Sequence, residues 1–319
     1  MYKDEALKLY RKLYLTRRAE EKIGEEYFKD GMKTPVHLGI GGEAIPIGVC
    51  HSLPIGFKAF GTYRNHTLYL TMTEDTDGFF AELYGKVTGS GKGKAGSMHL
   101  CAPENGLVAT SAVVASTIPV AVGVALANAY RGSKDFVVVF FGDGAVEEGT
   151  FWESLNFACL KQLRVLFVCE DNDLAIHTPA SERQGFRTIL DAIGGFKCYS
   201  DEADGHNLLE VISATSQMVK KMLEHPRPGF IRFPYLRFLE HVGPREDFNT
   251  GYRPKPDQSE MNRLDPLLAY EQSLLNMGCS EKDLLSVQAE VRKQIDRSVK
   301  MAESAPFPDA SELYQDVLI

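Results

Sequence analysis

The chain has 319 residues, of which 44% are hydrophobic and 24% charged, so it can bury a large core and is not disordered over most of its length. Its 35 Lys and Arg against 43 Asp and Glu give a net charge of −8, which argues against a nucleic-acid binder. The six cysteines form no C-x-x-C pair, which excludes the usual zinc and disulfide patterns and indicates a cytoplasmic protein.

The N-terminal part of the chain is predicted to be mostly helical. Residues 1–30 carry apolar side chains near helical spacing, and a short helix is expected over residues 44–50. Residues 85–97 are rich in glycine and are predicted to form a loop. No residue between Asn105 and Tyr130 is charged, but this stretch is rich in small residues and contains Pro119. We therefore expect a buried small-residue helix there and no membrane span.

The middle of the chain predicts a strand, a helix and a second strand. Residues 136–141 (FVVVFF) and 164–170 (RVLFVCE) are apolar runs of strand length, and residues 150–162 place apolar side chains on one helical face. Such a unit joins two parallel strands through a right-handed crossover. Residues 243–260 are predicted to form a mobile surface loop, and the last 50 residues to be helical and to end in a tail over Ser304–Leu318.

Polar residues follow both predicted strands. Gly142, Asp143 and Gly144 follow the first, and Asn172 follows the second. Ligands of parallel sheets bind beyond the carboxyl ends of the strands, and a crossover brings these two ends close together. A carboxylate oxygen, an amide oxygen and a nearby backbone carbonyl suit Mg²⁺, which also takes phosphate oxygens as ligands. Glycines and a helix N-terminus favour a phosphate, so these residues predict a Mg²⁺-diphosphate site.

Two neighbouring features have simpler interpretations. Glu147 and Glu148 fall in the first turn of the predicted helix, where acidic residues favour the helix dipole. Because they would repel a diphosphate, we expect them to point away from it. Residues 91–96 match the spacing G-x-G-x-x-G, but no strand precedes them, so a nicotinamide site is not favoured.

The stretch GDGAVEEGTFWESLNFACLKQLRVLFVCEDND resembles the thiamine-diphosphate fingerprint. Further stretches resemble the alpha subunits of 2-oxo acid dehydrogenases of the pyruvate, branched-chain and acetoin types. The resemblance covers residues 5–318 and implies a three-layer α/β thiamine-diphosphate-binding fold with a mainly parallel sheet. It predicts a cofactor-binding domain over residues 1–260 and a helical C-terminal extension over residues 261–319. The agreeing stretches are HLGIGGEA, YRNH, GKGKAGSMH, ASTIPVAVGVALA, RFLEHVGP and SAPFPDASELYQDV.

The resemblance also implies roles for individual residues. Mg²⁺ would be bound by the side chains of Asp143 and Asn172 and the backbone carbonyl of Leu174, and thiamine diphosphate is the implied cofactor. His241, Arg237 and His66 are the candidate catalytic residues, although a hydrogen-bonded structural role for His66 is an equal alternative. The implied cofactor-binding residues are His37, Tyr63, Arg64, Ala112, Val114, Asp143, Gly144, Ala145, Asn172, Leu174 and His241.

The activity implied is decarboxylation of a pyruvate-like 2-oxo acid and transfer of the acyl unit to a lipoyl group on an acyltransferase core. In this family the glutamate that activates the cofactor comes from a separate beta chain, so a heterotetramer of two alpha and two beta chains is expected, and the isolated chain should be inactive. Leu239-Glu240-His241 leaves one histidine in a loop where the family usually has two. This loop keeps one alternative open, which is acetoin cleavage or acyloin or ketol transfer without a lipoyl partner. A separate alternative is a non-catalytic scaffold for a beta chain.

Overall fold

Two apolar runs form the centre of a six-stranded sheet in the computed structural model, which describes residues 2–315. These runs are the strands β3 (Val137–Gly142) and β4 (Val165–Asp171), within one residue of the predicted bounds. They pair in parallel, from Val137 opposite Val165 to Gly142 opposite Glu170. The predicted strand–helix–strand unit is confirmed.

All neighbouring strands of this sheet are parallel. Because every strand runs in the same direction, the carboxyl ends of the strands share one edge of the sheet, where ligands of such folds bind. The predicted α/β fold with a mainly parallel sheet is therefore confirmed. The strand order is β2 (Leu107–Ser111), β1 (Lys58–Thr62), β3, β4, β8 (Gly229–Pro234) and β7 (Tyr199–Glu202).

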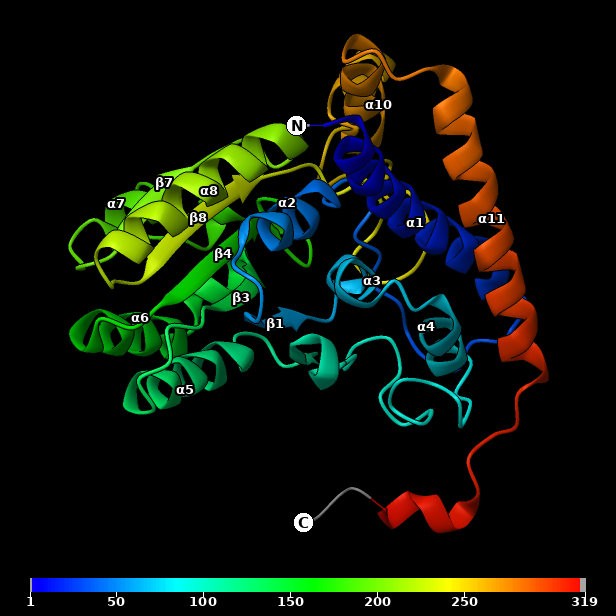
Figure 1. The fold of residues 1–319 in the computed structure, drawn as a ribbon, viewed down its shortest axis with the longest axis horizontal. Helices are drawn as coiled ribbons and strands as arrows, with labels where there is room; N and C mark the ends of the chain where they lie inside the picture. Colours follow the sequence, from blue (N-terminus) through cyan, green and yellow to red (C-terminus); the bar gives the residue numbers. More distant parts are fainter. Residues whose placement is uncertain (1, 316–319) are drawn as a thin grey trace.

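The sheet separates two hydrophobic cores. Successive side chains of a strand point to opposite faces, so Val138 and Phe140 enter one core, whereas Val139 and Phe141 enter the other. Both faces are covered by helices, which explains why these strands are almost continuously apolar instead of alternating. Figure 1 shows the two groups of helices above and below the strands.

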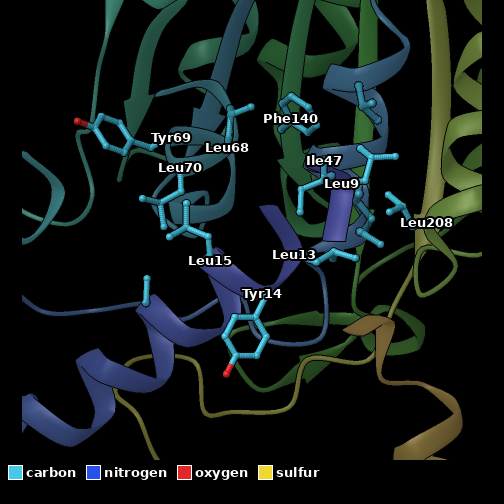
Figure 2. Packing of buried hydrophobic residues seen from close by; sticks show 14 of the residues in the cluster. Leu9, Leu13, Tyr14, Leu15, Ile47, Leu68, Tyr69, Leu70, Phe140 and Leu208 are labelled. Carbon is cyan, nitrogen blue, oxygen red and sulfur yellow. The ribbon is translucent and has the colours of Figure 1, made fainter. Parts of the chain in front are cut away.

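The first face is covered by α2 (Ala44–Ser52) and α8 (Leu208–Glu224), which pack closely on each other. A Cβ atom at Gly48 would lie 2.6 Å from Val211, so this approach requires glycine. The long helix α1 (Lys3–Tyr27) adds a further layer over α2 and confirms the predicted N-terminal helix. Figure 2 shows residues of α1, α2, α8 and β3 in this core, among them Leu9, Leu13, Ile47, Leu208 and Phe140.

The same core extends to the helices at the C-terminal end of the chain. Residues of α10 (Pro266–Asn276) and α11 (Glu281–Ser304) share it with α1, so the predicted C-terminal extension packs directly on the N-terminal helix. After α11 the chain stays attached to the glycine-rich loop, because Lys94 Nζ donates to the carbonyl of Glu312 over 3.2 Å. The turn η4 (Ala310–Tyr314) stands apart from the sheet in Figure 1. Residues 316–318 of the predicted tail lie outside the described residues. The remaining helices here are α3 (His66–Thr73), α4 (Thr76–Leu83) and α9 (Gln258–Arg263).

The second face is covered by α5 (Thr117–Tyr130), α6 (Gly149–Lys161) and the short α7 (Ile189–Ile193). The helix expected between Asn105 and Tyr130 is confirmed only over Thr117–Tyr130, and only one side of it is buried. The chain first forms a short 3₁₀ turn, η1 (Pro103–Asn105), and the strand β2, and the outer side chains of α5 are exposed. Gly106 reverses the chain at φ 90°, and the β-branched residues that follow favour a strand.

The segments that follow β3 and β4 shape the edge of the sheet. A 3₁₀ turn, η2 (Asp143–Glu147), separates β3 from α6, so Glu147 and Glu148 precede the helix instead of forming its first turn. The helix itself lies within one residue of the predicted range 150–162. After β4 the chain forms a small antiparallel hairpin, β5 (Leu174–Ala175) and β6 (Thr178–Pro179), and then the turn η3 (Ala180–Glu182). No helix within residues 2–315 is long and apolar enough to cross a membrane.

Candidate functional site

A cavity of about 260 Å³ lies at the carboxyl ends of β1, β3 and β4. Its walls come from the turn after β1, the turn η2 after β3, the hairpin after β4 and the segment after β8. The sequence prediction placed a ligand at this edge. The predicted site residues that line the cavity are Tyr63, Arg64, Val114, Asp143, Gly144, Ala145, Asn172, Leu174, Arg237 and His241.

Three predicted residues lie behind or beside this lining. The ring of His37 packs 4.4 Å from that of Tyr63 and 5.2 Å from that of His241, measured between ring centroids. Ala112 lies between Ser111 and Val113, which line the cavity. His66 is buried below the surface, with its Nδ1 3.0 Å from Glu20 Oε1 and its Nε2 2.8 Å from Ser97 Oγ. Both ring nitrogens of His66 thus have hydrogen-bond partners, which is the arrangement expected if His66 has a structural role.

Asp143 is the buried acidic group of the cavity. Its Oδ2 accepts a hydrogen bond from Arg183 Nη2 over 2.5 Å, whereas its Oδ1 is buried without a partner among the described residues. Burial raises the pKa of the Asp143 carboxyl to about 6, the nearby Asp171 adds to this, and Arg183 opposes it. A buried carboxylate oxygen without a donor is costly, so it favours a cation that would bind there.

Asn172 and Leu174 lie at the start of the hairpin beside Asp143. The amide of Asn172 donates to Tyr235 Oη over 3.2 Å, and its Oδ1 accepts from the backbone N–H of Leu174 over 3.2 Å. Within the described part of the chain, no three His, Cys, Asp or Glu side chains are placed to hold a metal. A cation here would therefore need the mixed set of carboxylate, amide and carbonyl oxygens, which suits a hard ion such as Mg²⁺.

Two arginines give the cavity a positive side, the buried Arg237 and the half-buried Arg64. Arg64 donates to the carbonyl of Leu38 over 2.9 Å and to that of His241 over 3.1 Å, and its burial lowers the pKa of its guanidinium. Arg237 donates through Nε to the carbonyl of Leu239 over 2.9 Å and through Nη2 to Tyr252 Oη over 3.0 Å. Its Nη1 is buried and finds no acceptor in residues 2–315. This unpaired donor fits an anionic ligand.

His241 is neutral in this setting. Burial lowers its pKa to about 4, and the charges of Arg64 and Arg237 act in the same direction. Its Nδ1 lies 3.1 Å from Arg64 Nη2, and because arginine only donates hydrogen bonds, Nδ1 must be the acceptor. The proton of the neutral ring therefore resides on Nε2. His37 is also kept neutral, because burial lowers its pKa to about 3.

Comparison with known proteins identifies the family. Residues 11–311 match the family described as dehydrogenase E1 component. The chain belongs to this family. It is 32% identical over 317 residues to the alpha subunit of acetoin:2,6-dichlorophenolindophenol oxidoreductase of Bacillus subtilis, covering 99% of this chain and 94% of the relative. It is 31% identical over 319 residues to the alpha subunit of the pyruvate dehydrogenase E1 component of Rhizobium meliloti, covering 99% of this chain and 91% of the relative.

One part of the site in this E1 chain was missed by sequence reasoning. Arg183 lies in the segment after η3, yet its guanidinium pairs with both Asp143 and Glu147. The expectation that Glu147 and Glu148 point away from the site is wrong, because both line the cavity. The positive charge of Arg183 offsets the repulsion that the prediction assumed. No periodicity or motif marks Arg183, so its position depends on the folded hairpin.

The segment over residues 243–260 also differs from its prediction as a mobile surface loop. Its centre is fixed by Asp247, which is 4% exposed and pairs with Arg237 and with Arg253, itself 8% exposed. Tyr252 Oη donates to the same carboxylate. Asp247 therefore holds Arg237 of the E1 cavity in place, and this contact could not be recognised from a stretch rich in proline and charges.

Proposed function

We propose that this chain is the alpha subunit of a thiamine-diphosphate- and Mg²⁺-dependent dehydrogenase that decarboxylates a 2-oxo acid and passes the acyl unit to a lipoyl group. One observation carries the proposal. The cavity holds a buried carboxylate oxygen of Asp143 without a donor and a buried N–H group of Arg237 without an acceptor, counting residues 2–315. A magnesium diphosphate would satisfy both, since its cation needs oxygen ligands and its phosphates need donors.

The residues around the cavity fit this cofactor. Asp143, Asn172 and the backbone carbonyl of Leu174 would hold Mg²⁺. Gly144 lets the turn η2 pack closely on the hairpin, because a Cβ atom there would lie 3.0 Å from Ala175 Cβ. Arg237 would then face the diphosphate. The negative charge of the bound phosphates would explain why the positive charges of Arg64 and Arg237 lie near each other.

The cofactor, when bound, would supply an electron sink that stabilises the carbanion left by decarboxylation. The chain itself would bind the diphosphate, exclude water and place proton donors. His241, with its proton on Nε2, is suited to donate a hydrogen bond to the oxygen of a substrate carbonyl. Arg64 would keep this tautomer in place by donating to Nδ1.

A beta chain would complete the site. Val113 and Val114 line the cavity and are exposed to solvent, so the cavity is open on the side of α5. Other exposed apolar residues on the helices of this face are Val120 on α5 and Leu160 on α6. Such a surface is typical of a protein interface. The partner would supply the glutamate that activates the aminopyrimidine of the cofactor, in a heterotetramer of two alpha and two beta chains.

Acetoin cleavage is a second candidate function. The relative from Bacillus subtilis is named an acetoin oxidoreductase, and its identity of 32% is close to the 31% of the pyruvate dehydrogenase relative. The substrate pocket would be built partly by the beta chain. The two reactions differ in the substrate cleaved, whereas the cavity of this chain would bind the same cofactor in both.

The proposal is tested by turnover. The chain is purified alone and with its co-expressed beta chain, and pyruvate, branched-chain 2-oxo acids and acetoin are compared as substrates, with dichlorophenolindophenol as the electron acceptor. We expect activity from the pair with one substrate class and none from the isolated chain. Turnover by the isolated chain would contradict the shared site, and no turnover by the pair with any of these substrates would contradict the enzymatic proposal.

A further inference from the structure

Arg183 holds Asp143 from the side opposite its unpaired oxygen, although the two residues are 40 positions apart in the chain. The side chain of Arg183 is 9% exposed, that of Asp143 is 1% exposed, and the Nη2–Oδ2 distance is 2.5 Å. Because this bond occupies Oδ2, only Oδ1 is left for a cation. The pairing therefore determines which oxygen of Asp143 points to the cation site.

The same guanidinium also holds the hairpin that carries the carbonyl of Leu174. Arg183 Nε donates to the carbonyl of Thr178 over 2.8 Å, and Nη2 lies 3.3 Å from the carbonyl of Asp173. Asp173 precedes the strand β5, and Thr178 follows the turn that joins β5 to β6. Arg183 thus connects the side-chain ligand Asp143 to the segment of the backbone ligand Leu174.

The hairpin requires such support because its backbone is strained. Asp173 has φ 64° and Ile176 has φ 59°, in the left-handed region. A β-branched residue such as Ile176 is rare there, and the conformation persists only where the surroundings impose it. Arg183 supplies several of those contacts, and its Nη1 also pairs with Glu147 on the opposite wall of the cavity.

The neighbouring carboxylate of Asp171 differs from that of Asp143 in its hydrogen bonds. Asp171 Oδ2 accepts from Arg232 Nε over 2.5 Å, and its Oδ1 accepts from the backbone N–H of Asp173 over 2.8 Å. Both oxygens of Asp171 are therefore engaged within the chain, whereas Asp143 keeps one oxygen free. Two buried carboxylates, each paired with one arginine, differ in whether an oxygen is left to bind a metal.

We propose that Arg183 is a positioning residue of the cation site: it fixes Asp143 and the Leu174 carbonyl in one arrangement before the cation binds. The inference rests on the proposed Mg²⁺-diphosphate function. Groups that hydrogen-bond metal-ligating carboxylates typically change metal affinity by about 10–100-fold when they are removed. If Arg183 were instead a simple counter-ion, its positive charge would oppose the cation, and removing it would strengthen binding.

The test measures Mn²⁺ affinity by electron paramagnetic resonance in the presence of thiamine diphosphate, on the chain with its beta partner. Arg183→Gln removes the charge, and Arg183→Lys keeps it but cannot bridge the same acceptors. Arg187→Gln is the matched control, because that side chain is 88% exposed in the same segment. We expect both Arg183 variants to bind Mn²⁺ about 10–100-fold more weakly and the control to bind like the wild type. Unchanged or tighter binding by Arg183→Gln would overturn the proposal.

A second measurement does not depend on the cofactor. Hydrogen exchange of residues 173–184 is followed in the wild type and the same variants without metal or thiamine diphosphate. Both Arg183 variants should exchange faster in this segment, while the strands β3 and β4 stay protected. Unchanged exchange would overturn the positioning role. Failure of the wild type to bind Mn²⁺ would reject the proposed function instead, and the exchange result would still decide whether Arg183 holds the hairpin.

Discussion

The two faces of the sheet are built differently. The first face is covered by α2 and α8 and then by α1, α10 and α11, which share one continuous core. The second is covered by α5, α6 and α7 in a single layer, and the outer side of this layer exposes apolar residues such as Val120 and Leu160. The first face is thus covered by two layers of helices from the chain itself. On the second face, the exposed Val113 and Val114 before α5 border the open side of the cavity, where a partner would bind.

The largest expected effect is on the free energy of unfolding. It is measured at two adjacent phenylalanines of β3 that point to opposite faces of the sheet. Phe140 is buried in the first core, whereas Phe141 is buried in the second and borders the cavity. Phe140→Ala should lower the free energy of unfolding by about 3–5 kcal/mol. Phe141→Ala should cost less, because it enlarges a space that already exists. Chemical denaturation of both variants measures this, and an equal loss would mean that the two faces are packed alike.

The next prediction concerns the exposed surface of the second face. Leu160→Glu should raise the dissociation constant for the beta chain at least about 10-fold, because it places a charge in an apolar interface. The stability of the isolated chain should change by less than about 0.5 kcal/mol.

Leu285→Glu on α11 is the matched control, since Leu160 is 72% exposed and Leu285 is 62% exposed. Sedimentation of each variant with the beta chain measures the association. If Leu285→Glu weakened the complex and Leu160→Glu did not, the partner would bind the first face, and the comparison of the faces would be wrong.

The smallest expected effect is a change in the pKa of His241. Arg64→Gln should raise the pKa of His241 from about 4 toward its ordinary value, because a nearby positive charge and the donor to Nδ1 are removed. Arg245→Gln, on the same loop but exposed, should leave the pKa of His241 unchanged. Histidine resonances followed by NMR between pH 3 and 8 measure how far the pKa of His241 moves toward the ordinary histidine value of 6.5.

The sign of the linked stability effect follows from the lowered pKa. The unfolded chain takes up the His241 proton below about pH 6.5, whereas the folded chain does so only near pH 4. This histidine therefore makes folding less favourable as the pH falls from 6.5 to 4. Arg64→Gln should reduce that part of the loss, and an unchanged His241 titration in this variant would mean that Arg64 is not a cause of the shift.

Much of the site followed from local sequence. The strands β3 and β4 are long apolar runs, and a parallel crossover places the residues after them, Asp143 and Asn172, at the same edge. Local sequence patterns could not identify Arg183 or Asp247. Arg183 pairs with Asp143, which is distant in the sequence, and Asp247 pairs with Arg237 before it and Arg253 after it. The exposure of α5 was missed for a related reason: an uncharged helix suits a core and a partner surface equally well.

The central claim is that this E1 chain holds the diphosphate and cation half of a shared site. Calorimetric titration of thiamine diphosphate with Mg²⁺ tests it directly, on the chain alone and with its beta chain, with Asp143→Ala as the control. We expect binding that appears or tightens with the beta chain and is lost in Asp143→Ala. No binding under either condition, or equal binding by the variant, would contradict the claim and favour a chain that only scaffolds its partner.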